Sequence, residues 1–99
     1  MNQVSKKQAQ RNIEIRKIKK ELPEHCVLCG RSPVVAAHLL PKSVWPEYYT
    51  EPLNLTSLCD ECHDEHDNRI SFRFRQTKLY EQVMKFDPKA ANRHYGKNT

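Results

Sequence analysis

The first regular pattern of apolar and polar positions predicts a helix over residues 5–21. Ser5 is a favourable N-cap residue, and Pro23 cannot continue a helix, so both ends of the element carry a signal. Apolar residues recur between these signals at the spacing of three and four that places them on one helix face. The helix therefore combines a narrow apolar stripe with basic side chains in its other directions. The stripe consists of Ile15, Ile18 and Leu22.

The next apolar run, residues 34–40, is short and ends at a proline, which predicts a strand with His38 on it or at its end. Residues 56–58 predict the return strand. The segment between them, residues 41–54, holds three prolines and three aromatic residues. We expect a long structured loop there, with one helical turn around residues 42–49. The three aromatic residues are Trp45, Tyr48 and Tyr49.

The last third of the chain predicts helices over residues 63–75 and 77–85, and a polar tail over residues 89–99 that is expected to fray. Acidic residues near the start of the first of these helices favour its N-terminus. The whole pattern predicts a small α+β fold. Its one domain is expected to comprise a basic arm (1–22), a core (23–76), and a C-terminal helix with a tail (77–99).

All four cysteines occur in Cys-x-x-Cys pairs, which changes the picture of how so small a chain is stabilised. With 99 residues, 37% of them hydrophobic, the domain is near the size at which a metal or disulfide must supplement the core. Two pairs flanking a polar insert favour one structural zinc per chain over a dithiol redox site. We expect the stripe of the first helix to pack on this zinc core. The predicted ligands are Cys26, Cys29, Cys59 and Cys62.

The formal charge of +5 is concentrated in the arm. Residues 1–22 carry seven Lys or Arg against two Glu, whereas residues 23–99 carry ten basic against ten acidic residues. Such a basic helix is typical of a phosphate-backbone contact, although a solvated helix face would look the same. The sequence shows no apolar leader and no run of about 18 apolar residues. We therefore expect a cytoplasmic protein without a membrane partner.

Four stretches of the sequence carry a recognisable pattern: "CVLCG", "AAHLLPKS", "NLTSLCDECH" and "DEHD". Together, over about residues 26–67, they resemble the HNH endonuclease family. The resemblance implies a ββα-metal (His-Me finger) core that carries a zinc-knuckle pair and is flanked by N- and C-terminal helices. It also implies an enzyme that nicks or cuts DNA through one divalent ion, which could be Mg²⁺, Mn²⁺, Ni²⁺ or Zn²⁺. Small stand-alone enzymes of this kind are carried by phages and mobile elements, so a bacterial or phage-infected cell is expected.

The resemblance also assigns roles to three residues. His38 would be the general base that deprotonates the attacking water, and Asn54 would hold His38 or its loop. His63 would bind the divalent ion that stabilises the charge developing on the phosphate. Any one of these residues alone would be read as an ordinary surface, core or turn residue. Their order and spacing together favour the functional reading.

One position departs from the family pattern. The residue before the catalytic histidine is usually Asp or His and supplies a second metal ligand, but here it is Ala37. Asp67 lies four residues after His63 and can share its helix face, so Asp67 is the first candidate to replace the lost ligand and His66 the second.

DNA is the expected partner, mostly through backbone contacts. Arg69 and Arg73, near the metal residues, are further candidates for phosphate contact, and the loop aromatics could stack on a splayed base or belong to the core. The rival hypothesis is a non-catalytic zinc module with the same fold that binds nucleic acid or protein. Ala37 favours that rival, whereas the presence of His38, Asn54 and His63 together favours the enzyme. The basic residues of the arm are Lys6, Lys7, Arg11, Arg16, Lys17, Lys19 and Lys20.

Overall fold

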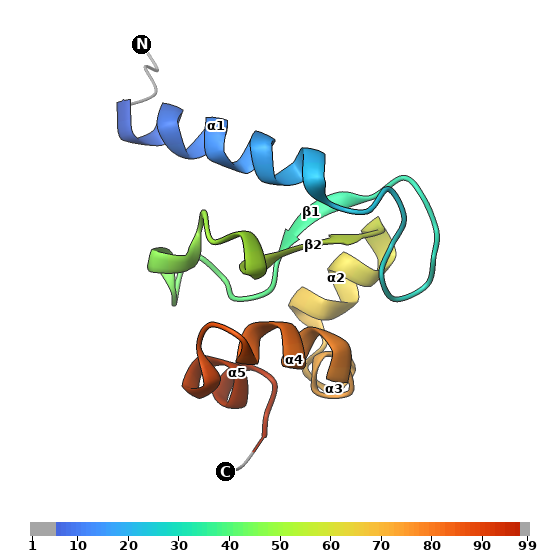
Figure 1. The fold of residues 1–99 in the computed structure, drawn as a ribbon. Helices are drawn as coiled ribbons and strands as arrows, with labels where there is room; N and C mark the ends of the chain where they lie inside the picture. The colour runs from blue at the N-terminus through green and yellow to red at the C-terminus, as the bar shows by residue number, and fades with distance from the viewer. Residues whose placement is uncertain (1–5, 98–99) are drawn as a thin grey trace.

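The chain folds around a two-stranded antiparallel hairpin, with one helix on one side and the remaining helices on the other (Figure 1). This computed structural model describes residues 6–97, and side chains from residue 9 onward. Within that part the fold is small α+β, as the sequence predicts. Its elements are α1 (Lys6–Glu21), β1 (Val35–His38), the 3-10 turns η1 (Pro46–Tyr48) and η2 (Pro52–Asn54), β2 (Leu55–Leu58), α2 (Asp60–Asn68), α3 (Ile70–Phe74), α4 (Thr77–Met84) and α5 (Pro88–His94).

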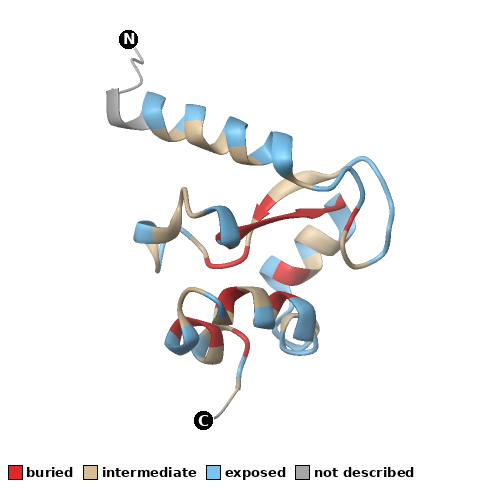
Figure 2. Ribbon diagram, viewed as in Figure 1, coloured by how far each residue is buried: buried red, intermediate tan, exposed pale blue. Residues whose placement is uncertain are grey.

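The hairpin is in a register that pairs Val35 with Leu58 and His38 with Leu55. All four residues of β2 are buried, so this strand runs through the interior of the domain (Figure 2). The predicted strand over residues 34–40 is shorter than expected. It ends at His38, but the chain continues inward with buried Leu39, whose amide donates to the Asn54 carbonyl.

Two apolar clusters hold the elements together. The smaller cluster lies between the hairpin and the cysteine loops, and the larger one joins the end of β1 to the two C-terminal helices. Val27 and Leu28 pack against both clusters and so connect them. The smaller cluster contains Cys26, Ala37, Leu58 and Cys59, and the larger one contains Leu39, Leu40, Leu79, Val83, Ala90, Ala91 and Tyr95.

The helix predicted over residues 63–75 is instead two helices, and the first of them starts earlier. The Cys59 side chain caps α2 by accepting from the Cys62 amide. The chain is extended at Arg69, with φ −118° and ψ 100°, so α2 ends there and α3 begins in a new direction. The Arg73 guanidinium, in α3, donates to the His66 carbonyl and so satisfies an acceptor in the last turn of α2.

The expectation that residues 89–99 fray is wrong for the described part of that segment, which forms α5. Asp87 caps this helix by accepting from the Ala90 amide at 3.0 Å, and Pro88 occupies its first turn. Ala91 and Tyr95 are both fully buried, which ties the segment to the core. The pair Asp87 and Pro88 is a local signal for the start of a helix, and the helix forms although the residues around it are polar.

The apolar stripe of α1 is less buried than predicted. Ile15, Ile18 and Leu22 are half-buried, and none of them belongs to either apolar cluster. The helix projects along one side of the hairpin, and no part of it is coloured as buried in Figure 2. Among residues 6–97, no helix has the length and apolar character needed to cross a bilayer.

We predict that Asp87→Ala lowers the free energy of unfolding by about 1–3 kcal/mol, because it removes both the α5 cap and the acceptor of the Tyr48 hydroxyl, 2.6 Å away. Urea denaturation followed by circular dichroism measures this change. Glu81→Ala, at an exposed position of α4, is the control and should stay within about 0.5 kcal/mol of wild type. Equal stability of the Asp87 variant and wild type would show that neither the cap nor the bond to Tyr48 contributes to stability.

Candidate metal and catalytic site

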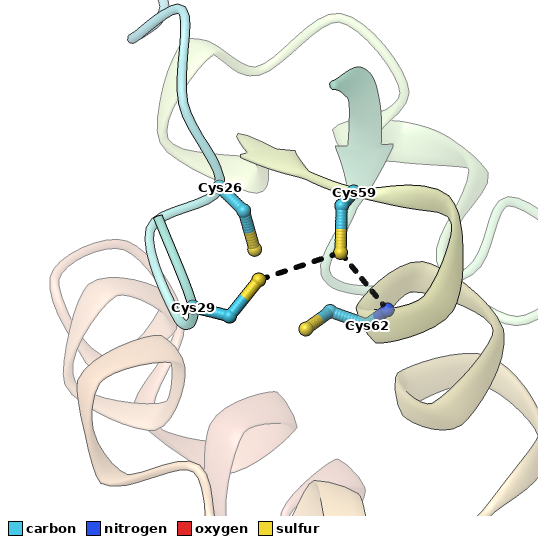
Figure 3. A group of neighbouring side chains, drawn as sticks. All are labelled: Cys26, Cys29, Cys59 and Cys62. Carbon is cyan, nitrogen blue, oxygen red and sulfur yellow. Dashed lines mark hydrogen bonds between the residues drawn. The ribbon is translucent and has the colours of Figure 1, made fainter. Parts of the chain in front are cut away.

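The four cysteines predicted to bind zinc come together in one cluster (Figure 3). Their sulfurs all lie within 4.8 Å of one another, and the sulfurs of Cys29 and Cys59 are 3.5 Å apart. Thiolates about 2.3 Å from a tetrahedral zinc ion lie about 3.8 Å from one another, so the donor set and its spacing fit that ion. In the described part of the chain, this is the only group of three or more candidate ligands found close enough to hold a metal.

Two different local structures present these sulfurs. In the first loop the Gly30 amide donates to the Cys26 carbonyl at 2.8 Å, and Gly30 adopts φ +78°, which a residue with a side chain rarely does. The second pair spans the start of α2, where Cys59 is the N-cap and Cys62 lies in the first turn. The sequence therefore builds one knuckle from a glycine turn and the other from a helix N-terminus.

The thiols of the cluster differ in how readily they lose a proton. Burial raises the pKa of Cys26, but hydrogen bonds from the backbone of Cys59, Cys29 and Leu28 outweigh it and lower the pKa to about 6. Burial, together with bonds to the other sulfurs, raises the pKa of Cys62. Four thiolates therefore do not coexist at neutral pH in this space unless a positive ion neutralises them.

On the other side of the hairpin, His38 is held by the loop that follows it. Its Nε2 lies 2.8 Å from the Tyr49 carbonyl oxygen, and its ring stacks on the Tyr49 ring with centroids 4.7 Å apart. A carbonyl only accepts, so Nε2 carries the proton of this hydrogen bond. Burial lowers the pKa of His38, which keeps the ring neutral at physiological pH and leaves Nδ1 with a free lone pair.

Asn54 fixes that loop from inside the protein, where its side chain is fully buried. Its Oδ1 accepts from the Leu40 amide at 2.8 Å, and its Nδ2 donates to the carbonyls of Leu40 and Tyr48. These bonds join the residue two positions after His38 to the residue just before Tyr49. Asn54 thus orients His38 through the backbone of the loop, without a direct bond between the two side chains among those observed.

His63 and Asp67 face the same cavity as His38. The cavity has a volume of about 320 Å³ and is lined by Ala36, His38, Leu39, Pro41, His63 and Asp67. Nε2 of His63 and Oδ2 of Asp67 are 3.1 Å apart, on consecutive turns of α2. This is the distance of an ion pair between the two side chains, and two oxygen or nitrogen ligands at right angles on one octahedral ion would lie at about the same separation, about 3 Å.

His66, the second candidate for the missing ligand, points elsewhere. Its side chain is only 1% exposed, and it does not line the cavity. Nδ1 lies 3.0 Å from Asp67 Oδ1 and Nε2 lies 2.8 Å from the Tyr95 hydroxyl, so both ring nitrogens already have partners. Of the two helix candidates, the geometry favours Asp67.

Ala37 also lies away from the cavity. It is fully buried in the cluster with Cys26, Leu58 and Cys59, because alternate residues of a strand point to opposite faces. Its neighbour Ala36 is the residue that lines the cavity beside His38. The position that the HNH resemblance associates with a second metal ligand therefore belongs here to the packing around the cysteines.

The predicted nucleic-acid contacts are spread over α1, the junction between α2 and α3, and α3. Arg11 lies 5.9 Å above the centroid of the Tyr49 ring and so lies close to the His38 loop. Arg69 is exposed and paired with Glu65, whereas Arg73 is engaged with the carbonyls of His66 and His94. Lys6 and Lys7 belong to α1, but their side chains lie outside the described part. The remaining arm residues, Arg16, Lys17, Lys19 and Lys20, are exposed.

Sequence reasoning missed three contributors to the site. The Nζ of Lys42 lies 4.8 Å from the Tyr49 ring centroid, which adds a second cation beside the candidate base. Tyr49 contributes its carbonyl and ring to His38, and Tyr95 contributes its hydroxyl to His66. A backbone acceptor leaves no sequence signal, and a partner 29 residues away from His66 follows no local spacing. The other two loop aromatics, Trp45 and Tyr48, pack against the larger apolar cluster.

Comparisons with family models, with curated proteins and with solved structures find no match to this chain.

Removal of one cysteine is expected to unfold the domain, because the binding energy of a structural zinc is part of the folding energy. We predict that Cys59→Ser, which also alters the α2 cap, loses the bound metal and melts far below wild type. Elemental analysis and thermal melting with and without a chelator measure both effects. Ser71→Ala, at an exposed position of α3, provides a control that leaves the four sulfurs intact. A folded wild-type sample without zinc would contradict the prediction.

Proposed function

We propose that this protein is a metal-dependent endonuclease of the HNH kind, which hydrolyses phosphodiester bonds of DNA. The observation that carries the proposal is the single cavity lined by His38 from β1 and by His63 and Asp67 from α2. Metal-assisted hydrolysis requires a general base and side chains that hold the metal ion, here a histidine and an aspartate. The sequence places them in the order that the HNH resemblance implies.

In this proposal His38 accepts the proton of the attacking water at Nδ1. Its Nε2 is bonded to the Tyr49 carbonyl, so the orientation and tautomer of the ring are set before substrate binds. The lowered pKa of His38 keeps the base unprotonated over most of the physiological range. Asn54 preserves this arrangement by holding the loop that carries Tyr49.

His63 and Asp67 are the residues proposed to hold the divalent ion. When bound, such an ion stabilises negative charge on the phosphate and on the leaving oxygen. The chain's own part is to present an imidazole nitrogen and a carboxylate oxygen 3.1 Å apart on the cavity wall. The closed set of four cysteines offers no open position and is assigned to the structural ion instead.

The DNA backbone would lie along α1 and the His38 loop. Arg11 and Lys42 both stand over the Tyr49 ring, which itself stacks on His38. Two cations so close to the base suit the phosphates that flank a scissile bond, and phosphate contacts carry no sequence information. We therefore expect an enzyme with little sequence preference.

The second candidate function is a zinc module that binds nucleic acid without cleaving it. The small number of side-chain ligands in the cavity, His63 and Asp67, favours this alternative, because the position that the resemblance associates with a further ligand is the buried Ala37, which does not line the cavity. Cleavage assays separate the two functions directly, since the module would retain DNA affinity and show no dependence of cleavage on metal or on His38.

We predict that His38→Ala lowers plasmid nicking by about a hundredfold or more, the range expected for loss of a general base, and leaves the circular dichroism spectrum unchanged. His25→Ala, an exposed histidine beside the first knuckle, is the matched control and should cut at the wild-type rate. Nicking is measured with Mg²⁺, Mn²⁺ or Ni²⁺ and with a chelator. No cleavage by wild type with any ion would favour the non-catalytic module.

The pH profile gives a separate check on His38. Because burial lowers the pKa of His38 below 6.5, the neutral form persists to lower pH than in a free histidine. The nicking rate should therefore be constant at neutral pH and fall only as the pH drops through a value below 6.5. A rate that still rises between pH 7 and 8 would point to a different base. Circular dichroism at each pH verifies that the protein remains folded.

We predict that Arg11→Ala weakens DNA binding for all sequences alike and lowers the slope of log affinity against log salt by about 0.9, the value for one phosphate contact. Fluorescence anisotropy of a labelled duplex between 50 and 200 mM salt, about the range over which such slopes are resolved, measures this change. Lys85→Ala removes an equal charge at an exposed position just after α4 and should leave the slope unchanged. Equal effects of both variants would indicate a general charge effect.

A further inference from the structure

A buried chain of hydrogen bonds connects the C-terminal helix to the cavity. The Tyr95 hydroxyl lies 2.8 Å from His66 Nε2, and His66 Nδ1 lies 3.0 Å from Asp67 Oδ1. Tyr95 is fully buried, and the His66 side chain is 1% exposed. The proposed cleavage mechanism uses neither residue. A buried histidine and a buried tyrosine hydroxyl that satisfy each other need a reason for being present in so small a core.

The direction of each bond follows from what its atoms can donate. A carboxylate oxygen only accepts, so His66 Nδ1 carries a proton and donates to Asp67. In the neutral ring Nε2 is then an acceptor, and the Tyr95 hydroxyl donates to it. Each of the two buried side chains thus has one orientation in which its polar atoms are satisfied.

This chain of hydrogen bonds ends at the carboxylate of Asp67 and holds it in place, although Asp67 is itself about half exposed. His66 occupies Oδ1, and Oδ2 is left 3.1 Å from His63 Nε2 at the cavity. Without the His66 bond, only the contact with His63 would restrain this half-exposed carboxylate. The bond therefore reduces the entropy that Asp67 loses when it binds an ion.

The backbone around this chain of hydrogen bonds is also held in place. Arg73 donates to the His66 carbonyl at 3.1 Å and to the His94 carbonyl at 2.9 Å. It therefore links the last turn of α2 to the end of α5, next to Tyr95. This link holds the backbone next to Tyr95 close to the backbone of His66.

We propose that His66 and Tyr95 are positioning residues for Asp67, so that α5 determines how tightly the His63–Asp67 pair binds a divalent ion. This inference rests on the proposed function, because it assigns a partner to the same ligand pair. It also explains why His66 is a histidine without being a ligand. Histidine offers one nitrogen to the carboxylate and a second to a support, which is the arrangement by which outer residues orient metal ligands.

The test measures metal affinity and requires no cleavage. Co²⁺ is titrated by calorimetry into zinc-loaded protein, since the thiolate cluster favours zinc over cobalt and remains filled. Loss of outer-shell partners typically weakens metal affinity 10- to 100-fold. We expect His66→Ala to weaken Co²⁺ binding within about that range, and Tyr95→Phe to weaken it by about tenfold or less.

Two further variants separate positioning from packing. His66→Asn retains a donor near the place of Nδ1 but not the bond to Tyr95, so it should restore most of the affinity that His66→Ala loses. Tyr80→Phe is the matched control for Tyr95→Phe. Tyr80 packs near Tyr95, and its hydroxyl also donates within the protein, to Asn92, so its loss should not change Co²⁺ affinity.

The outcomes distinguish this inference from the function on which it rests. Weaker binding by His66→Ala and Tyr95→Phe, with partial recovery in His66→Asn, supports it. Wild-type affinity in folded His66→Ala protein overturns the positioning role and leaves the ligand pair intact. If His66→Ala, His66→Asn, Tyr95→Phe and Tyr80→Phe all lose Co²⁺ affinity equally, with matching losses in melting temperature, these residues act by packing. That result also overturns the positioning role. A wild-type protein that binds no Co²⁺ beside its zinc overturns the inference together with the proposed metal site.

Discussion

The buried amide of Asn54 is the interaction on which the geometry of the cavity depends. Its side chain bonds to the backbone at Leu40 and at Tyr48, and so closes the long loop between β1 and β2. Three hydrogen bonds inside the protein are a strong constraint, since each partner left without a bond would cost about 1–3 kcal/mol. The hairpin holds the backbone of His38 opposite Leu55. The orientation of its ring follows from where Asn54 places the Tyr49 carbonyl.

The cysteine cluster sets the opposite boundary of the site. Cys59 directly follows β2 and caps α2, and Cys62 lies in the first turn of that helix. An ion bound by the four sulfurs would therefore fix where α2 begins relative to β2. Because His63 is the next residue, any shift of the knuckle would move the first candidate ligand of the cavity. The stability of the fold and the geometry of the site are coupled through this one junction.

Sequence patterns predicted the features that are local. The two knuckles, the short hairpin, η1 and α4 follow from cysteine spacing, apolar runs and prolines, and each lies close to its predicted place. Two features were missed. The break at Arg69 is stabilised by Arg73, which bonds to the His66 carbonyl and also to the distant His94 carbonyl. The helix α5 has a local start signal at Asp87 and Pro88, but its polar composition does not reveal that Tyr95 is buried in the core. The burial of the α1 stripe was overestimated, because periodicity does not show how much of the domain a helix face can reach.

The same reasoning explains why α2 can serve three environments at once. Successive residues of a helix point about 100° apart, so Cys62 reaches the sulfur cluster while His63 reaches the cavity. One turn later Asp67 returns to the cavity, and His66 faces the core and Tyr95. Nine residues thus connect a structural ion site, a candidate catalytic pair and the C-terminal helix. A change of one residue in the register of α2 would disturb all three, so the helix needs the constraints at both ends, from Cys59 and from Arg73.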